Sequence, residues 1–253
     1  MKKRLDQLLV ERGLAESRAQ AQALVMAGRV RGFDKAGQQV DDAVELDLTE
    51  VPRFVSRGGE KLDHALDVFG VDPARRAAVD VGASTGGFTD LLLQRGAARV
   101  IALDVGRGQL HERLRDDPRV IVMESVNARH LDELPFQPEL VVADVSFISL
   151  RQALPPVLRL AAPGWEGVIL VKPQFEAGRA DVKGGVVRDA TVQERVLREI
   201  AEAALEWEGE TRGVTDSGLP GPKGNREFFL HLTHNPRPGL PAALDDWIAD
   251  AVG

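Results

Sequence analysis

AVDVGASTGGFTD, residues 78–90, joins a short apolar run to a glycine-rich turn and then to the start of a helix. An uninterrupted apolar run of this kind is typical of a strand buried on both faces of a parallel sheet. Glycines let the backbone approach a ligand closely, and the positive end of the following helix favours a bound anion. The motif therefore predicts the strand, turn and helix of a ligand-binding α/β sheet.

The same alternation of strand and helix continues toward the C-terminus. Further apolar strands are predicted at residues 100–104, 120–123, 140–144 and 168–172, and helices at 88–95 and 191–207. This order is typical of a doubly wound α/β domain. A strand near 212–214 and a strand at 228–232 are joined only by a Gly/Pro-rich loop, 218–224, too short for the crossover that parallel neighbours need. The last strand should therefore be antiparallel, and such a sheet resembles the Rossmann-like fold of S-adenosylmethionine (SAM) dependent methyltransferases.

The glycine-rich turn predicts a site for SAM. The methionine end of SAM carries a carboxylate, which suits a helix N-terminus. Asp104 ends the second strand, where a carboxylate can accept hydrogen bonds from both ribose hydroxyls of a nucleoside. A dinucleotide is the competing ligand, but the turn lacks the G-x-G-x-x-G spacing. The residues expected at the cofactor are Asp80, Gly82, Ser84, Gly86, Gly87, Phe88, Asp104, Asn127 and Asp144.

The ends of the later strands bear on the methyl acceptor. The chain has no Cys, the nucleophile that methylation of a pyrimidine carbon commonly uses, and no Tyr. The fourth strand ends Asp144-Val145-Ser146-Phe147, and not in the Asn/Asp-Pro-Pro-Tyr/Phe cluster typical of enzymes that methylate base amino groups. Lys172 follows four apolar residues, and burying an ammonium there is costly unless it is paired or used. The remaining candidates at this edge of the sheet are charged side chains.

Four of these charged residues, Lys61, Asp144, Lys172 and Glu227, resemble the Lys-Asp-Lys-Glu tetrad of FtsJ-type ribose methyltransferases, in the same chain order. The resemblance implies that Lys172 receives or orients the ribose 2′-hydroxyl, with Asp144 as its ion-pair partner. It also implies that Lys61 and Glu227 hold the hydroxyl and Lys172 in place. For each residue taken alone, a salt bridge at the edge of the sheet is the alternative.

Charge is distributed unevenly along the chain. The net charge is −7, but residues 1–35 carry eight basic and four acidic side chains, a net charge of +4. The rest of the chain therefore carries −11. A basic end on an acidic body is expected when one part holds a phosphate backbone and another part does chemistry. A solvated helical surface is the alternative.

The basic end has a pattern of its own. Leu5, Leu8 and Leu9 share one helical face, and Gly13 ends that helix. Ser17 is predicted to cap a second helix, 18–27, which Gly28 ends, and short strands are expected at Val30 and at 44–48. The segment RLDQLLVERGLAESRAQAQALVMAGRVRG resembles the αL RNA-binding module of a ribosomal small-subunit protein. The resemblance implies RNA contacts by Arg4, Arg18, Arg29 and Arg31, and we add Arg57.

Several segments together, FVSRGGEKL, DVGASTGGFTD, ADVSFISL, VKPQFE and GNREFF, are similar to the TlyA/hemolysin A family. That resemblance implies methylation of cytidine riboses in ribosomal RNA of the small subunit, the large subunit or both. It implies an RNA-binding domain at 1–52, a linker at 53–59 that follows a strand stopped at Pro52, and a catalytic domain at 60–253.

Other functions are disfavoured in different degrees. Without Cys there is no disulfide or Cys-based zinc site, and we expect no metal. No apolar run approaches the ~20 residues that span a bilayer, so a membrane-active hemolysin is disfavoured and a cytoplasmic location is expected. A non-catalytic RNA-binding or ribosome-assembly factor remains an alternative. A pseudouridine synthase is a weaker one, because the strand pattern argues against it. The oligomeric state is left open.

Overall fold

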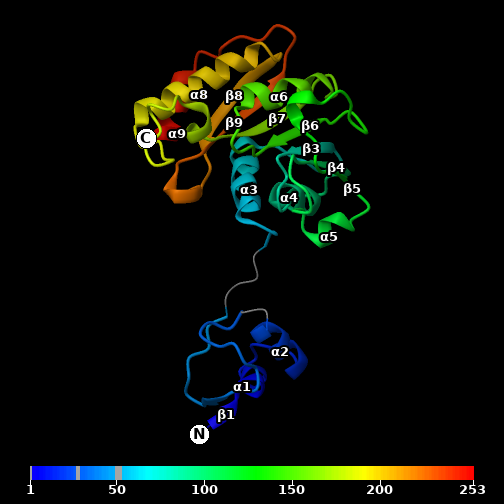
Figure 1. Ribbon diagram of the computed structural model, residues 1–253, viewed down its shortest axis with the longest axis vertical. Helices are drawn as coiled ribbons and strands as arrows, with labels where there is room; N and C mark the ends of the chain where they lie inside the picture. Colours follow the sequence, from blue (N-terminus) through cyan, green and yellow to red (C-terminus); the bar gives the residue numbers. More distant parts are fainter. Residues whose placement is uncertain (1, 27–28, 49–52) are drawn as a thin grey trace. The chain divides into compact units, whose positions relative to one another are not determined.

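The computed structural model describes residues 2–26, 29–48 and 53–253, and the chain divides into two compact units, Met1–Arg53 and Phe54–Gly253 (Figure 1). Each unit has its own hydrophobic core. Two expectations from the sequence, Gly28 as the end of the second helix and Pro52 as the end of a strand, lie outside the described residues.

The N-terminal unit consists of two helices and a small sheet. Its elements are β1 (Lys2–Arg4), α1 (Leu5–Glu11), α2 (Arg18–Met26) and β2 (Gln39–Asp41). Leu5, Leu8 and Leu9 on α1 are buried in one cluster with Ala21 and Val25 of α2, as the helical spacing predicts. The hydroxyl of Ser17 accepts a hydrogen bond from the Gln20 amide at 3.2 Å, so Ser17 caps α2.

The strands of this unit differ from those that the sequence predicts. β1 pairs with β2 in an antiparallel sheet, and neither strand was expected. The predicted strand at 44–48 is wrong, because within residues 2–26, 29–48 and 53–253 its one ladder contact is an isolated bridge between Leu48 and Val30. Its alternation is nevertheless real, since Val44, Leu46 and Leu48 pack against the core while Glu45 and Asp47 are exposed. The pattern records which side chains face the core, and not which backbone groups pair.

The C-terminal unit is built on a seven-stranded sheet within residues 53–253. Its spatial order is β5-β4-β3-β6-β7-β9-β8. The strands are β3 (Ala77–Val81), β4 (Arg99–Leu103), β5 (Val120–Met123), β6 (Leu140–Ala143), β7 (Glu166–Val171), β8 (Gly209–Asp216) and β9 (Phe228–His234). Strands β5, β4, β3, β6 and β7 pair in parallel, and β9 pairs antiparallel to both β7 and β8. This confirms the predicted parallel sheet with one antiparallel hairpin strand.

Helices cover both faces of the sheet (Figure 1). One core cluster joins a face of the sheet to α3 (Arg57–Phe69) and α4 (Gly87–Gln94). The other joins the opposite face to α6 (Leu150–Arg159), α8 (Ala190–Leu205) and α9 (Leu244–Val252). Two short helices, α5 (Glu112–Arg115) and α7 (Pro173–Glu176), and two 3₁₀ turns, Ala128–His130 and Pro222–Gly224, complete the unit. No helix among the described residues is long and apolar enough to cross a membrane.

α3 begins earlier than the sequence indicates. Arg57 to Gly59, assigned above to a linker, form its first turn. Gly59 lies against the ring of Phe54, where a β-carbon would clash, so this turn is packed into the C-terminal unit. Lys61 therefore lies in the second turn of α3.

Candidate active site

Two ion pairs, one buried and one partly buried, contain the four residues of the predicted tetrad. The Lys61 ammonium on α3 donates to Glu227 Oε2 at 2.5 Å, across 166 residues of sequence. Lys172, which follows β7, pairs with Asp144, which follows β6. Lys61, Lys172 and Glu227 are 8%, 9% and 1% exposed, so these are groups removed from bulk water. Each charge has an opposite charge in contact, which offsets part of its desolvation cost.

Sheet register places the two ion pairs side by side. Val171 of β7 lies opposite Phe228 of β9, so the next residue on β7 and the preceding residue on β9 are Lys172 and Glu227. Gln174, two residues after Lys172, donates its amide to Glu227 Oε1 at 3.0 Å. Both oxygens of the Glu227 carboxylate are therefore occupied, one by Lys61 and one by Gln174.

The Lys172 ammonium has a second partner. It donates to the hydroxyl of Ser146 at 2.9 Å, in addition to its ion pair with Asp144. Ser146 lies in an exposed turn after β6, and the next residue, Phe147, has a left-handed φ of 65°. A bulky residue rarely adopts this conformation, and such strain concentrates at functional sites. The Phe147 side chain is 92% exposed, with its ring 5.1 Å from that of Phe175.

A pocket of about 1050 Å³ lies next to this ion-pair cluster, at the carboxyl ends of β3, β4 and β6. Ligands bind at this edge in open α/β sheets. Five of the nine residues predicted at the cofactor line the pocket: Gly82, Ser84, Asp104, Asn127 and Asp144. Phe147 and Ser146 line it as well.

The residues of this wall suit a nucleoside. Each oxygen of Asp104 accepts one backbone hydrogen bond, from Ser84 at 2.7 Å and from Gly106 at 2.6 Å, which fixes the carboxylate. A carboxylate offers about four acceptor positions, so a pair of ribose hydroxyls can still be bound. Gly82, at φ 87°, lies where an added β-carbon would be 2.6 Å from the Asp144 carbonyl oxygen. Only glycine fits this turn, and these residues fit the SAM that the fold implies.

Four other predicted cofactor residues, Asp80, Gly86, Gly87 and Phe88, are not part of the pocket wall. The Asp80 carboxylate accepts hydrogen bonds from the amide and hydroxyl of Thr89 at 2.9 and 2.7 Å, which holds α4 against β3. Gly87 gives space to Ser56, and the Phe88 ring packs 6.1 Å from the Phe229 ring. Contact of these four residues with the cofactor stays a prediction: the side chains of Asp80 and Phe88 are used in packing, and Gly86 and Gly87 form the N-terminus of α4.

Asp80 has an unusual protonation equilibrium. Burial raises its pKa from 3.8 to about 7, and the nearby charge of Asp144 acts in the same direction, while the hydrogen bonds from Thr89 oppose the rise. Its Oδ1 atom is buried without a hydrogen-bond partner among the described residues. An ionised carboxylate in such a place is costly, so the proton is retained into the neutral range.

In the N-terminal unit, two of the predicted RNA-contacting arginines share one buried carboxylate. Arg4 and Arg18 donate to Asp6 Oδ2 at 2.9 and 3.2 Å, and Gln22 donates to the same oxygen at 2.9 Å. The contact with Arg4 is the largest cause that holds the pKa of Asp6 far below its usual range. The two arginine side chains remain 42% and 56% exposed, so both can still contact an anion.

The other predicted RNA-contacting arginines lie in different surroundings. Arg31 is exposed and pairs with Asp47 at 3.3 Å, and Arg29 is half-buried. Arg57 belongs to the C-terminal unit, where its exposed guanidinium donates to the Pro220 carbonyl at 3.1 Å. RNA contact by these five arginines stays a prediction.

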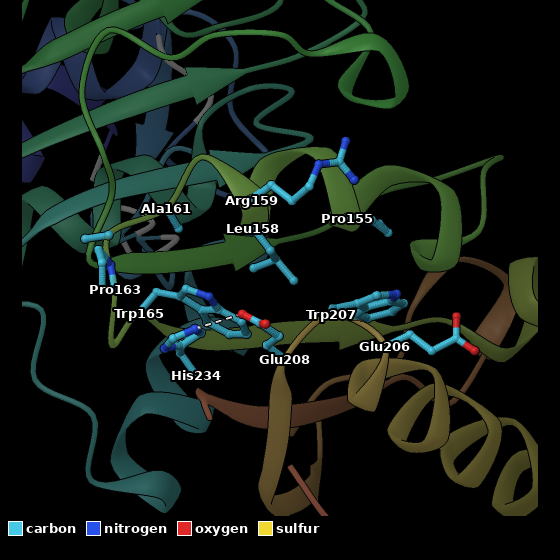
Figure 2. A pocket seen from close by; sticks show the side chains of 11 residues that line it. Pro155, Leu158, Arg159, Ala161, Pro163, Trp165, Glu206, Trp207, Glu208 and His234 are labelled. Carbon is cyan, nitrogen blue, oxygen red and sulfur yellow. Dashed lines mark hydrogen bonds and ion pairs between the residues drawn. The ribbon is translucent and has the colours of Figure 1, made fainter. Parts of the chain in front are cut away.

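Another pocket, of about 450 Å³, lies at the opposite edge of the sheet. Figure 2 shows Trp165, Trp207 and Leu158 around it, with His234 paired to Glu208 at 3.2 Å. Trp165 precedes the first residue of β7, whereas Lys172 follows the last, so a strand length of ~20 Å separates the two edges. No tetrad or predicted cofactor residue lines this pocket, and it is not the candidate active site.

Sequence reasoning missed Ser146, Gln174 and Phe147 as members of the site. Their neighbours Asp144 and Lys172 are the only local signal that could have suggested them. Both hydrogen bonds join residues that are distant in sequence, Ser146 to Lys172 and Gln174 to Glu227. Only the fold brings them together.

Comparison with known proteins agrees with this geometry. Residues 54–234 match the FtsJ-like methyltransferase family, and residues 3–31 match the S4 domain. The 16S/23S rRNA (cytidine-2'-O)-methyltransferase TlyA of Mycobacterium tuberculosis is 46% identical, over 98% of this chain and 97% of its own length. Hemolysin A of Brachyspira hyodysenteriae is 38% identical, over 90% of this chain and 99% of its own length.

The fold is similar to solved structures as well. A protein of Streptococcus thermophilus, provisionally named a hemolysin, matches with a TM-score of 0.77 and 42% identity, over 99% of this chain and 95% of that one. A SAM-dependent methyltransferase fold from Listeria monocytogenes matches with a TM-score of 0.54 at 17% identity, which bears on the fold alone. With its tetrad, its pocket and these matches, the chain belongs to the FtsJ-like methyltransferases of the TlyA/hemolysin A family and carries an S4 domain ahead of the catalytic one.

Proposed function

We propose that this SAM-dependent methyltransferase modifies the ribose 2′-hydroxyl of a cytidine in ribosomal RNA. The observation that carries the proposal is the two ion pairs, the buried Lys61–Glu227 and the partly buried Lys172–Asp144, beside a pocket of about 1050 Å³ at the carboxyl edge of the sheet. The relative from Mycobacterium tuberculosis, whose name specifies rRNA and cytidine, supports the choice of substrate.

SAM supplies a methyl group on a positively charged sulfur and leaves as a neutral thioether. The residues that would hold it are those of the pocket wall. Asp104 would accept hydrogen bonds from its ribose hydroxyls, and Gly82 and Ser84 would contact it along the glycine-rich turn. Asn127 accepts the Arg129 amide with its oxygen, at 3.1 Å, which orients its NH₂ group as a donor for the ligand.

The chain's own task is to orient the hydroxyl and to accept its proton. Once its ammonium has released a proton, the Lys172 amine takes the hydroxyl proton, and the ion pair with Asp144 stabilises the ammonium that results. Lys61 and Glu227 act differently. Both carboxylate oxygens of Glu227 already accept hydrogen bonds, so this pair holds the site in shape and leaves proton transfer to Lys172.

The surroundings of the tetrad also suit RNA. The exposed ring of Phe147 offers a face on which a nucleobase can stack. The S4 unit, proposed as residues 1–52, would hold the phosphate backbone through Arg4, Arg18, Arg29 and Arg31, with Arg57 as a contact from the catalytic unit. Catalysis is assigned to residues 60–253. A ribosomal substrate would place the enzyme in the cytoplasm.

The test is transfer of radiolabelled methyl from SAM to purified small and large ribosomal subunits, with wild type compared with Lys172→Ala. We expect label in an alkali-resistant 2′-O-methylated dinucleotide with the wild type and none with the variant. The labelled subunit then identifies the partner. If the wild type binds SAM but labels neither subunit, the proposed substrate is wrong.

The non-catalytic RNA-binding factor makes the opposite prediction. It requires that Lys172→Ala complements a deletion strain as well as the wild type does. The name hemolysin carried by relatives suggests a further control, leakage of red cells by purified protein. Dose-dependent lysis would support that activity.

A further inference from the structure

Ser146, which contacts Lys172, is not one of the four residues of the tetrad. The hydroxyl oxygen of Ser146 lies 2.9 Å from the Lys172 ammonium nitrogen and accepts a hydrogen bond from it. Ser146 is exposed, in the turn after β6, and its side chain lines the pocket. An exposed serine contributes little to folding, so the contact is poorly explained as a stabilising one.

The geometry of an amine shows what this contact can do. The Lys172 nitrogen carries its side-chain carbon and, when neutral, two N–H bonds and one lone pair. Ser146 accepts one N–H, and the Asp144 carboxylate is in ion-pair contact with the same nitrogen, so its charge attracts a second N–H. With one N–H held by Ser146 and the other drawn toward Asp144, the lone pair occupies the one remaining tetrahedral direction. A single acceptor would leave the amine free to rotate about its carbon–nitrogen bond.

We infer that Ser146 is a positioning residue that aims the lone pair of Lys172 at the ribose hydroxyl. The inference rests on the proposed function, in which Lys172 takes the hydroxyl proton. In that transfer the O–H bond would break as the new N–H bond forms in the direction that Ser146 and Asp144 leave open. The oxygen electron pair would form the bond to the methyl carbon while the methyl–sulfur bond breaks and leaves its electron pair on the sulfur of the neutral thioether. The turn holds Phe147 at a left-handed φ of 65°, and in this conformation Ser146 lies beside Lys172.

The kinetic test uses the full chain with the ribosomal RNA that the wild type methylates. Ser146→Ala should lower kcat about 10- to 100-fold, the effect of losing a hydrogen bond to a charged group. The dissociation constant for SAM, measured by calorimetry, should change less than threefold. Ser146→Thr retains the hydroxyl and should restore kcat to within about threefold of wild type, as a hydroxyl-dependent role requires.

A second variant gives a pH readout that a purely structural role would not move. Ser146→Asp places a second carboxylate next to Lys172 and stabilises its ammonium form. The rising limb of the kcat–pH profile should shift upward by about one pH unit. Ser125→Ala, at an exposed serine after β5 on the same edge of the sheet, is the matched control and should leave the profile in place. Equal kcat values for Ser146→Ala and Ser146→Thr, or an unshifted profile for Ser146→Asp, would overturn the inference.

An activity-independent measurement separates this inference from the proposed function. In protein with ¹⁵N-labelled lysine, a hydrogen-bonded buried ammonium gives its own NMR signal, which Lys172→Ala identifies by its loss. That signal should broaden or shift in Ser146→Ala and persist in Ser146→Thr. If the wild type labels no RNA yet this NMR pattern is found, only the proposed substrate fails. If the signal is the same in Ser146→Ala and wild type, the positioning role is wrong even for an active methyltransferase.

Discussion

Replacing Asp80 by Asn should remove most of the decrease in unfolding free energy that ionisation of Asp80 causes as pH rises. Burial raises the pKa of Asp80 from 3.8 to about 7, so the folded chain retains a proton that the unfolded chain has released. Stability from this group is fully present below pH ~4 and is lost as pH rises through 7, because above that pH the buried carboxylate must ionise. The sign is opposite to that of a salt-bridged aspartate.

The magnitude follows from the same pKa difference. At about 1.4 kcal/mol per pH unit, the interval from 3.8 to about 7 corresponds to about 4 kcal/mol of unfolding free energy. Between pH 5 and 7 the wild type should lose about 2.3 kcal/mol through Asp80, and Asp80→Asn should lose none through this position. For a domain of this size the difference corresponds to about 5–9 °C in Tm.

The assay is thermal or urea unfolding without SAM, followed by tryptophan fluorescence. All three tryptophans, Trp165, Trp207 and Trp247, belong to the C-terminal unit, so the signal reports the unit that contains Asp80. Asn still accepts the hydrogen bonds of Thr89 through its oxygen, which keeps the local structure comparable. The quantity to compare is the difference in unfolding free energy between variant and wild type at each pH. If that difference is the same at pH 5 and pH 7, Asp80 does not retain a proton in the folded chain.

Three further outcomes are expected. Lys61→Met leaves the Glu227 carboxylate buried without its cation and should lower the unfolding free energy in urea by about 3–5 kcal/mol. The double variant Lys61→Met, Glu227→Leu should recover most of that loss. If the losses of the two single variants simply add in the double variant, the pairing is contradicted. Gly82→Ala should weaken SAM binding at least tenfold by calorimetry, because its β-carbon meets the Asp144 carbonyl, and unchanged binding would refute the tight turn. Arg4→Ala should weaken rRNA binding and reduce the slope of log affinity against log salt by about 1, and an unchanged slope would exclude a phosphate contact.

Much of the fold could be predicted because its signals are short-range. The apolar runs around Val79 and Val141 and the glycine at Gly82 determine buried strands and a tight turn within a few residues. The antiparallel last strand followed from connection length alone, since the loop 218–224 is too short for a crossover. In the N-terminal unit the same reasoning failed for 44–48, because alternation reports burial and the sheet hydrogen bonds went to β1 and β2.

The candidate site divides in the same way. The sequence by itself indicated the chemical types of the tetrad and their order, because Asp144, Lys172 and Glu227 lie next to strand ends, where the local pattern is readable, and the resemblance to FtsJ-type enzymes added Lys61. Only the tertiary structure decided the pairing, Lys61 with Glu227 and Lys172 with Asp144, and the entry of Ser146 and Gln174 into the cluster. It also decided that Asp80 is buried against Thr89 and not exposed to the pocket. Ion pairing and proton affinity depend on distance and on exclusion of water, and both are properties of the folded chain that no run of neighbouring residues contains.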